Sequence, residues 1–367
     1  MECFPPVMTS SWQLNQRSPW LLIAPFFLWG TAMVAMKGVI DTTTPLFLAT
    51  LRLVPAGMLV LLAARLLNRE QPKTWQAWGW IALFALVDGT LFQGFLAEGL
   101  QRTGAGLGSV MIDSQPIAVA LMARFLFKEV VGLLGWVGLG IGIIGISLLG
   151  LPDLWFYQIA SYLSFWTKPA APVTATPQGL VEQLLGGGEW LMLLAALSMA
   201  VGTILITYVA RHVDPVVATG WHMVLGGLPL MGLSIWGESY QWQAITATGW
   251  LAIAYSTILG SAVAYGIFFY LASQGNLTSL SALTFLTPVF ALTFSTSLLS
   301  ENLTVLQWTG VGLTLISIYL VNQRVVLLRR LAALLAQGPL ADVNPDLAKS
   351  LAVWVRAQSI HAATPPD

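Results

Sequence analysis

Charged side chains are scarce in this chain of 367 residues, of which only 9% are Asp, Glu, Lys or Arg and 56% are hydrophobic. So little charge cannot coat a soluble globule of this size, because soluble domains carry about 25% charged residues. The 16 acidic and 16 basic side chains balance, and few of them fall inside a set of long apolar stretches. The composition therefore excludes a soluble enzyme and indicates a polytopic membrane protein.

Several other features are missing. The single cysteine, Cys3, cannot form an internal disulfide, so cysteine usage identifies no redox compartment. Residues 1–18 have no basic region before an apolar core, and we therefore expect no cleaved signal peptide. A Walker phosphate loop is absent, which leaves direct ATP coupling without support. Zinc-binding and aspartate-rich prenyl-diphosphate motifs are also absent, which weakens a membrane enzyme. We expect no cofactor, no metal ion and no nucleic-acid partner.

The apolar stretches have the length of membrane spans. A helix that rises ~1.5 Å per residue needs about 20 apolar residues to cross a ~30 Å hydrocarbon core. The sequence predicts an all-α membrane protein with ten transmembrane helices, at residues 20–40, 45–67, 76–98, 104–127, 131–151, 189–210, 215–236, 248–272, 277–299 and 304–322.

The positions of lysine and arginine predict the orientation, because positive residues near span ends are retained on the cytoplasmic side. With the N-terminus inside, only Arg102 and Lys168 fall in outer loops. The cytoplasmic face then carries Arg17, Arg65, Arg69, Lys73, Arg124, Lys128, Arg211, Arg324, Arg329 and Arg330. We therefore expect a multi-pass protein of the plasma (inner) membrane with both termini cytoplasmic.

The non-spanning pieces divide the chain into a cytoplasmic N-terminal segment (1–19), a first repeat (20–151), an outer linker (152–188), a second repeat (189–323) and a cytoplasmic tail (324–367). The linker has four prolines and an aromatic segment between Trp155 and Trp166 that suits the outer headgroup zone, with a gating lid as the alternative. The tail begins with arginines among leucine and alanine, which suits a short helix on the anionic inner leaflet.

The two halves share a pattern. Matching positions are Pro45 and Pro215, Gly79–Trp80 and Gly249–Trp250, Pro116 and Pro288, Glu129 and Glu301, Trp136 and Trp308, and Gly138 and Gly310. Because five spans is an odd number, the second unit must enter the membrane in the opposite sense. The pattern thus predicts two inverted five-helix repeats, an arrangement characteristic of secondary transporters with alternating access. A duplication that is only architectural is the alternative.

The motifs also resemble those of a known family. They are Trp29–Gly30 with Lys37 in the first span, Pro116 in the fourth with Glu129 at its end, and Trp136–Val137–Gly138 in the fifth, repeated as Pro288, Glu301 and Trp308–Thr309–Gly310. Over residues 20–323 the chain resembles the EamA family of the drug/metabolite transporter superfamily. The resemblance implies a ten-span exporter or permease for small metabolites, often amino acids, in a bacterial plasma membrane. It does not imply a particular substrate.

Two matched prolines are candidates for helix kinks or gates. Proline within a helix removes one backbone hydrogen bond, so Pro116 would free the carbonyl of Ile112 and Pro288 that of Thr284. Bending of the fourth and ninth spans would then open or close a cavity. Simple shaping of the helices is the alternative.

Charges inside the spans point to a substrate site, because a charge at the bilayer centre costs at least ~2.5 kcal/mol. The four are Lys37, Arg52, Asp88 and Asp113, and the second-half position that matches Arg52 is His222. Lys37 and Arg52 can also reach the headgroups by snorkelling. Asp88 is too short for that and must be paired, protonated or hydrated, which makes it a candidate for proton coupling.

Neighbouring polar residues complete the candidate set. Asp113, next to Ser114, is expected either to join the cavity or to neutralise Arg52. His222 titrates near neutral pH or packs through a hydrogen bond. The remaining candidates for substrate binding are Gln93, Gln115 and Tyr265.

Together these features predict a secondary transporter that exports small amphipathic or zwitterionic metabolites, such as amino acids, by alternating access. The alternatives are a multidrug or sugar-nucleotide permease and, from a different class, a membrane enzyme or a non-transporting scaffold. The expected partners are a small-molecule substrate, membrane lipids and coupling protons. The oligomeric state is not predicted.

Overall fold

The computed structural model describes residues 19–37, 39–102, 112–129, 131–150, 188–274, 277–299, 304–337 and 353, and within these ranges every regular element is a helix. The first half contains α1 (Pro19–Lys37), η2 (Ile40–Thr42), α2 (Pro45–Leu66), α3 (Trp75–Phe84), η3 (Ala85–Leu91), α4 (Phe92–Arg102), α6 (Gln115–Phe127) and α7 (Gly132–Gly150). The second contains α10 (Glu189–Val209), α11 (Pro215–Gly237), α12 (Ala247–Thr257), η4 (Ile258–Val263), α13 (Ala264–Ala272), α14 (Leu277–Ala282), η5 (Leu283–Phe285), α15 (Leu286–Leu299), α16 (Val305–Asn322) and α17 (Arg324–Gln337).

These helices confirm the predicted all-α membrane fold. Six described spans are individually long and apolar enough to cross a membrane, and four shorter apolar helices occupy the other predicted spans. The third and eighth spans are continuous, because α3, η3 and α4 follow one another without a break, as do α12, η4 and α13. The predicted N-terminal segment and nearly all of the outer linker lie outside the described residues.

The two halves are related by a twofold arrangement that appears in individual contacts. Helices α2 and α11 pack together, as do α7 and α16. Gly57 lies against Val224, and Gly227, its equivalent 170 positions along the chain, lies against Val54, the equivalent of Val224. The α7–α16 pair shows the same reciprocity, since Gly145 faces Thr314 and Gly142 faces Ser317, with 172 positions between equivalents. Small residues allow this close approach.

One detail of the predicted repeat is wrong. The third spans begin with matching caps, in which Thr74 Oγ1 accepts a hydrogen bond from the backbone of Ala77 and Thr246 Oγ1 accepts one from Gly249. Gly249 is therefore equivalent to Ala77 rather than to Gly79. The predicted match between Gly79–Trp80 and Gly249–Trp250 is therefore displaced by two residues. Equivalent residues of the two repeats are already 172 positions apart at the start of these helices.

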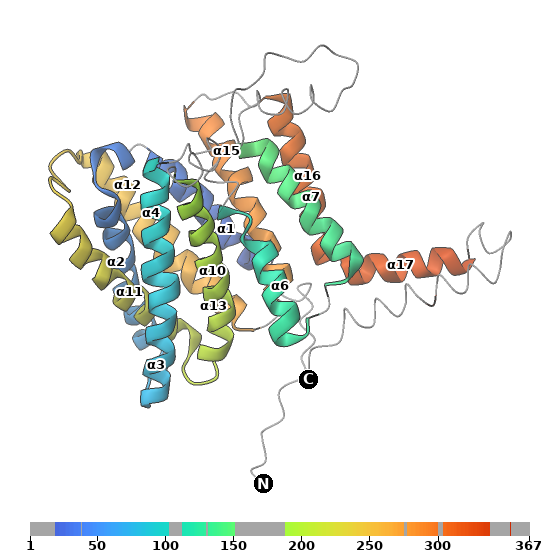
Figure 1. The fold of residues 1–367 in the computed structure, drawn as a ribbon, viewed down its shortest axis with the longest axis horizontal. Helices are drawn as coiled ribbons and strands as arrows, with labels where there is room; N and C mark the ends of the chain where they lie inside the picture. The colour runs from blue at the N-terminus through green and yellow to red at the C-terminus, as the bar shows by residue number, and fades with distance from the viewer. Residues whose placement is uncertain are drawn as a thin grey trace, which may run out of the picture.

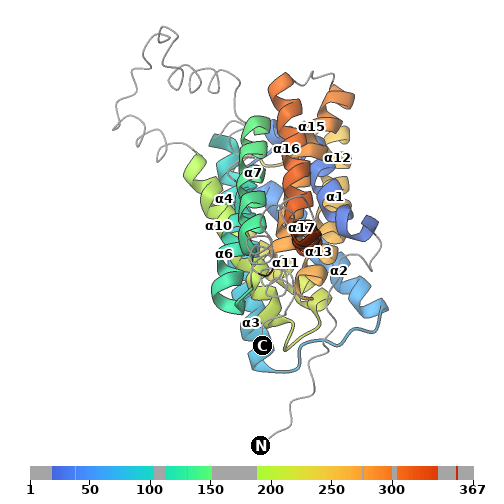
Figure 2. The ribbon, with the colours of Figure 1, turned by 90° about the vertical axis from the view of Figure 1, so that its right-hand side faces the viewer.

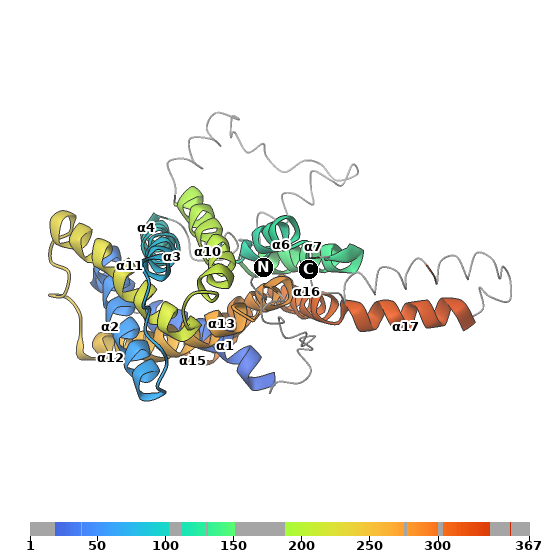
Figure 3. The same cartoon turned by 90° about the horizontal axis from the view of Figure 1, so that it is seen from below.

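The paired helices occupy opposite ends of an elongated bundle (Figures 1 and 3), with α2 and α11 at one end and α7 and α16 at the other. Most buried apolar residues form one cluster among the helices between and around α2 and α11. A second cluster, which includes Leu139, Phe285 and Val321, holds α7 and α16 against α6 and η5. The body of the bundle therefore has its own core, flanked by the α7–α16 pair.

The final described helix, α17, runs sideways from the bundle in Figure 1, whereas α7 and α16 stand upright in Figure 2. It begins at Arg324, whose buried side chain donates hydrogen bonds to Ser279 Oγ at 2.9 Å and to the carbonyl of Val321 at 3.0 Å. A guanidinium nitrogen also lies 3.4 Å from Glu129 Oε1. A helix does follow the last span, as predicted for the tail, and these contacts tie its first residue to both repeats.

Each long third span contains a π-helical segment, η3 in the first repeat and η4 in the second. Hydrogen bonds in a π-turn run from residue i to i+5, and such turns are frequent at functional sites. These segments were not predicted from the sequence. η3 widens its helix at the level of the buried Asp88, whereas η4 contains no charged residue.

Candidate functional site

The π segment η3 carries Asp88 into contact with His222 of α11. Asp88 is only 1% exposed and His222 is fully buried, and Asp88 Oδ2 lies 3.2 Å from His222 Nε2. The ring of Phe84 stacks on the imidazole with 4.1 Å between centroids, and Phe269 meets it edge-on. An acidic and a basic group thus face each other inside an aromatic enclosure.

The same carboxyl group rests against α10. An alanine methyl group at Gly202 would lie 2.7 Å from both Cβ and Cγ of Asp88, which is closer than real side chains approach. Glycine at this position therefore makes the space that Asp88 occupies. The next residue, Thr203, receives a hydrogen bond of 3.3 Å from the Gln115 amide of α6.

A buried hydrogen bond connects the third spans of the two repeats. Gln93 Nε2 donates to the Tyr265 hydroxyl at 2.8 Å. Gln93 is the second residue of α4 and Tyr265 the second residue of α13, so the bond joins equivalent positions. The indole of Trp29 lies 5.2 Å from the Tyr265 ring, and both Arg52 and Asp88 interact electrostatically with its hydroxyl.

Many polar atoms around this cluster have no hydrogen-bond partner within the described part of the chain. They are Trp29 Nε1, Arg52 Nε, Asp88 Oδ1, His222 Nδ1 and Gln115 Oε1, whereas Asp88 Oδ2 and His222 Nε2 face each other as an ion pair. A buried polar atom left unpaired costs about 1–3 kcal/mol, so such atoms are usually satisfied by water or a ligand. These buried hydrogen-bond donors and acceptors could therefore bind a polar solute.

Most of the predicted binding residues therefore come together. Asp88, His222, Gln93 and Tyr265 form the cluster with Arg52 beside it, and Gln115 joins it through α10. Lys37 is the last residue of α1, and its side chain lies outside what the structure describes.

The predicted neutralisation of Arg52 by Asp113 is not found. Asp113 is buried in the turn before α6, and no ion pair between described residues joins it to Arg52. The acidic group that acts on the same Tyr265 hydroxyl as Arg52 is Asp88. The depth of a residue along its helix, which the sequence supplies, does not determine the face on which it lies.

The two matched prolines begin helices. Pro116 is the second residue of α6, after a turn at Asp113 and Ser114, and Pro288 is the third residue of α15, after the 3₁₀ turn η5. Proline is well tolerated in the first turn of a helix, where its missing N–H has no intrahelical partner. Both therefore mark equivalent interruptions in the fourth and ninth spans, and their role as gates stays a prediction.

The α10 residues Gly202 and Thr203 were not predicted from the sequence, since a glycine and a threonine in an apolar span look like packing residues. Ser261 of η4, whose buried hydroxyl has no partner among the described residues, was not predicted either. Such residues could be found by looking for a small or hydroxyl side chain at the same membrane depth as a charged residue of a neighbouring helix. No group of three or more potential metal ligands occurs in the described ranges.

Comparison with known proteins identifies the family. The model of the EamA-like transporter family matches residues 17–151 and 186–323. An uncharacterized transporter from Synechocystis sp. is 64% identical over 310 residues, which cover 84% of this chain and 91% of that protein. A WAT1-related chloroplastic protein of Arabidopsis thaliana is 48% identical over 306 residues, 82% of this chain and 68% of that protein. A crystal structure shares the fold, with a TM-score of 0.63 at 17% identity over 82% of this chain and 94% of the other. The chain is therefore a multi-pass membrane protein that belongs to the EamA-like transporter family.

Proposed function

We propose that this transporter exports a small zwitterionic or amphipathic metabolite, such as an amino acid, by alternating access between its two inverted repeats. The observation that supports this proposal most strongly is the group of unpartnered polar atoms between the repeats, around Asp88, His222, Arg52 and Trp29. The group holds the buried carboxyl of Asp88 and imidazole of His222, with the half-buried Arg52 as a third, cationic side chain. A solute with both a cationic and an anionic group would complement it, because buried charges need partners.

Transport is driven, in this proposal, by protons that the Asp88–His222 pair exchanges. The Asp88–His222 pair is well placed to exchange a proton, since its carboxyl and imidazole groups lie 3.2 Å apart, buried between η3 and α11. We place the protein in the plasma (inner) membrane with both termini in the cytoplasm, because that orientation puts most lysines and arginines near span ends on the retained side.

Reconstituted protein in liposomes tests the function directly. A panel of amino acids, sugar nucleotides and cationic drugs, each offered on one side, should give saturable flux for at least one zwitterionic amino acid. Preferential flux of drugs or sugar nucleotides would select the alternative permease. An absence of saturable flux across the whole panel would favour a membrane enzyme or a scaffold.

Replacing Arg52 by lysine should raise the apparent KM for the transported solute about tenfold while the protein still folds. Arginine offers a planar fork that binds a carboxylate at two points, whereas lysine offers a point charge, and a charged hydrogen bond contributes about 1.5–3 kcal/mol. The initial rate of uptake over a range of solute concentrations measures this change. Snorkelling predicts the opposite, because either side chain reaches the headgroups, so an unchanged KM would assign Arg52 a structural role.

A further inference from the structure

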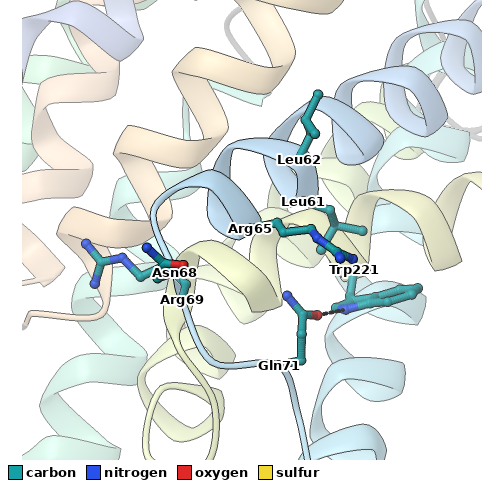
Figure 4. Close-up of a pocket in the computed structure, with 7 residues that line it drawn as sticks. All are labelled: Leu61, Leu62, Arg65, Asn68, Arg69, Gln71 and Trp221. Carbon is teal, nitrogen blue, oxygen red and sulfur yellow. Dashed lines mark hydrogen bonds between the residues drawn. The ribbon is translucent and has the colours of Figure 1, made fainter.

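A second polar site lies away from the central cluster, at the end of the bundle where α2 stops. A hollow of about 540 Å³ forms between the last turns of α2, the loop that follows and α11 (Figure 4). Leu61, Leu62 and Arg65 line it from α2, Gln71 from the loop and Trp221 from α11. One side of the hollow is therefore apolar and the other is basic.

The hydrogen bonds of the loop leave donors available. Trp221 Nε1 donates to Gln71 Oε1 at 3.0 Å, which fixes the side-chain amide so that its NH₂ group remains free to donate. Figure 4 shows the Arg65 side chain directed toward Gln71 and Trp221, whereas that of Arg69 points away from them. Arg69 is bound instead to Asp214, with 3.2 Å between Nη1 and Oδ2.

The charge of Arg65 is uncompensated. Among the ion pairs of the described residues, Arg69 is joined to Asp214 and Lys73 to Glu70, at 3.2 and 2.9 Å, but none includes Arg65. A free guanidinium beside a free amide donor is a suitable partner for one anionic group. Phosphate oxygens suit such donors, because guanidinium–phosphate hydrogen bonds are charge-assisted and often bidentate.

The apolar side continues along α2. Met58, Leu62 and Leu66 are exposed and stand four residues apart, so they form one stripe on the outside of the helix that ends beside Arg65. Exposed apolar side chains on a spanning helix face lipid chains. The hollow therefore joins an anion-binding corner to a lipid-facing stripe, which is the shape of an amphiphile with a negative headgroup.

We propose that this hollow binds an anionic phospholipid, with its phosphate held by Arg65 and the Gln71 amide and an acyl chain along Met58, Leu62 and Leu66. The end of the bundle that carries Arg65, Arg69 and Lys73 is the end that the sequence predicts to be cytoplasmic, where the leaflet is rich in anionic lipids. The site involves none of the buried residues of the central cluster.

Thermal unfolding of the full chain in detergent, titrated with phosphatidylglycerol or phosphatidylcholine, tests the site. Phosphatidylglycerol should raise the melting temperature of the native protein at a lower concentration than phosphatidylcholine. Arg65→Gln should raise the half-maximal concentration of phosphatidylglycerol about tenfold, since it removes a charged hydrogen bond. The matched control is Arg124→Gln, which neutralises an exposed arginine at the end of α6 and should leave that concentration unchanged.

Gln71→Leu changes no charge and should also raise the half-maximal concentration of phosphatidylglycerol. This variant separates binding at a specific site from general electrostatic attraction between basic residues and the lipid. Equal behaviour of Arg65→Gln and Arg124→Gln would overturn the proposal, as would equal effects of the two lipids. Glycerol 3-phosphate and inorganic phosphate serve as soluble probes and should not compete with the lipid. Competition by either at the lipid's concentration would assign the hollow to a soluble anion instead.

Discussion

Asp88→Asn should abolish the stimulation of transport by a pH gradient. In the native protein one pH unit is worth about 1.36 kcal/mol per proton, which drives about tenfold accumulation if one proton is exchanged per solute. Asparagine keeps the size of the side chain beside Gly202 and His222 but cannot release a proton. Uptake by inside-out vesicles with and without a gradient measures the effect, and the ratio of the two should fall to about one.

The control for this experiment is Asp113→Asn. Asp113 is also buried, but no ion pair joins it to another described residue. Its replacement by asparagine should therefore leave the gradient dependence intact, whatever it does to the rate. Equal gradient dependence in native and Asp88→Asn vesicles would remove Asp88 from the coupling role. A native protein that ignores the gradient would be a facilitator or would use another ion.

Gly226→Ala should strongly destabilise the protein. The added methyl group would lie 2.5 Å from Cα of Gly89 and 2.7 Å from the carbonyl oxygen of Ala85, and both are backbone atoms that cannot rotate away. Forcing such groups apart typically costs about 1–3 kcal/mol. We expect the melting temperature in detergent to fall by several degrees, as followed by size-exclusion chromatography of heated samples.

Gly232→Ala is the matched control, because it makes the same change in the same helix at a place with no atom within 4 Å of the new methyl group. Its melting temperature should stay close to that of the native protein. Gly226 lies one turn beyond His222, so moving α11 away from η3 should also separate His222 from Asp88 and weaken gradient-driven uptake. Indistinguishable melting of the two variants would show that the α11–η3 contact can relax.

The sequence predicts the spans well because a span requires only length and apolar composition. It also identifies Asp88, since an isolated carboxyl in the middle of a span has few acceptable environments. The partner of Asp88 was harder to predict. Asp88 reaches His222 through the π segment η3, and a helix with i→i+5 hydrogen bonds shifts the faces of all residues beyond it.

The same shift explains why Asp88 and Gln93 are both buried at the site although they are five residues apart. In a regular α-helix of 3.6 residues per turn, side chains five apart point to different faces. Neutralisation of Arg52 was one of the two roles expected of Asp113, and it is not found for a related reason, because similar depth in the bilayer was the only criterion available. Contacts between helices depend on how each helix is rotated about its own axis. The hydrophobic pattern of the sequence does not determine that rotation in spans that are apolar on nearly every face.

The hydrogen bond between Gln93 and Tyr265 and the pair formed by Asp88 and His222 behave differently when the two repeats exchange roles. The first joins equivalent positions, so exchange maps it onto itself and it can persist throughout the proposed cycle. In the pair formed by Asp88 and His222, by contrast, Asp88 is equivalent to Gly260 in η4 and His222 is equivalent to Arg52 in α2. A glycine and an arginine form no charged pair. If the carrier alternates between its repeats as proposed, we therefore expect the inward- and outward-facing states to have unequal energies, with the empty carrier resting in the conformation that keeps Asp88 and His222 in contact.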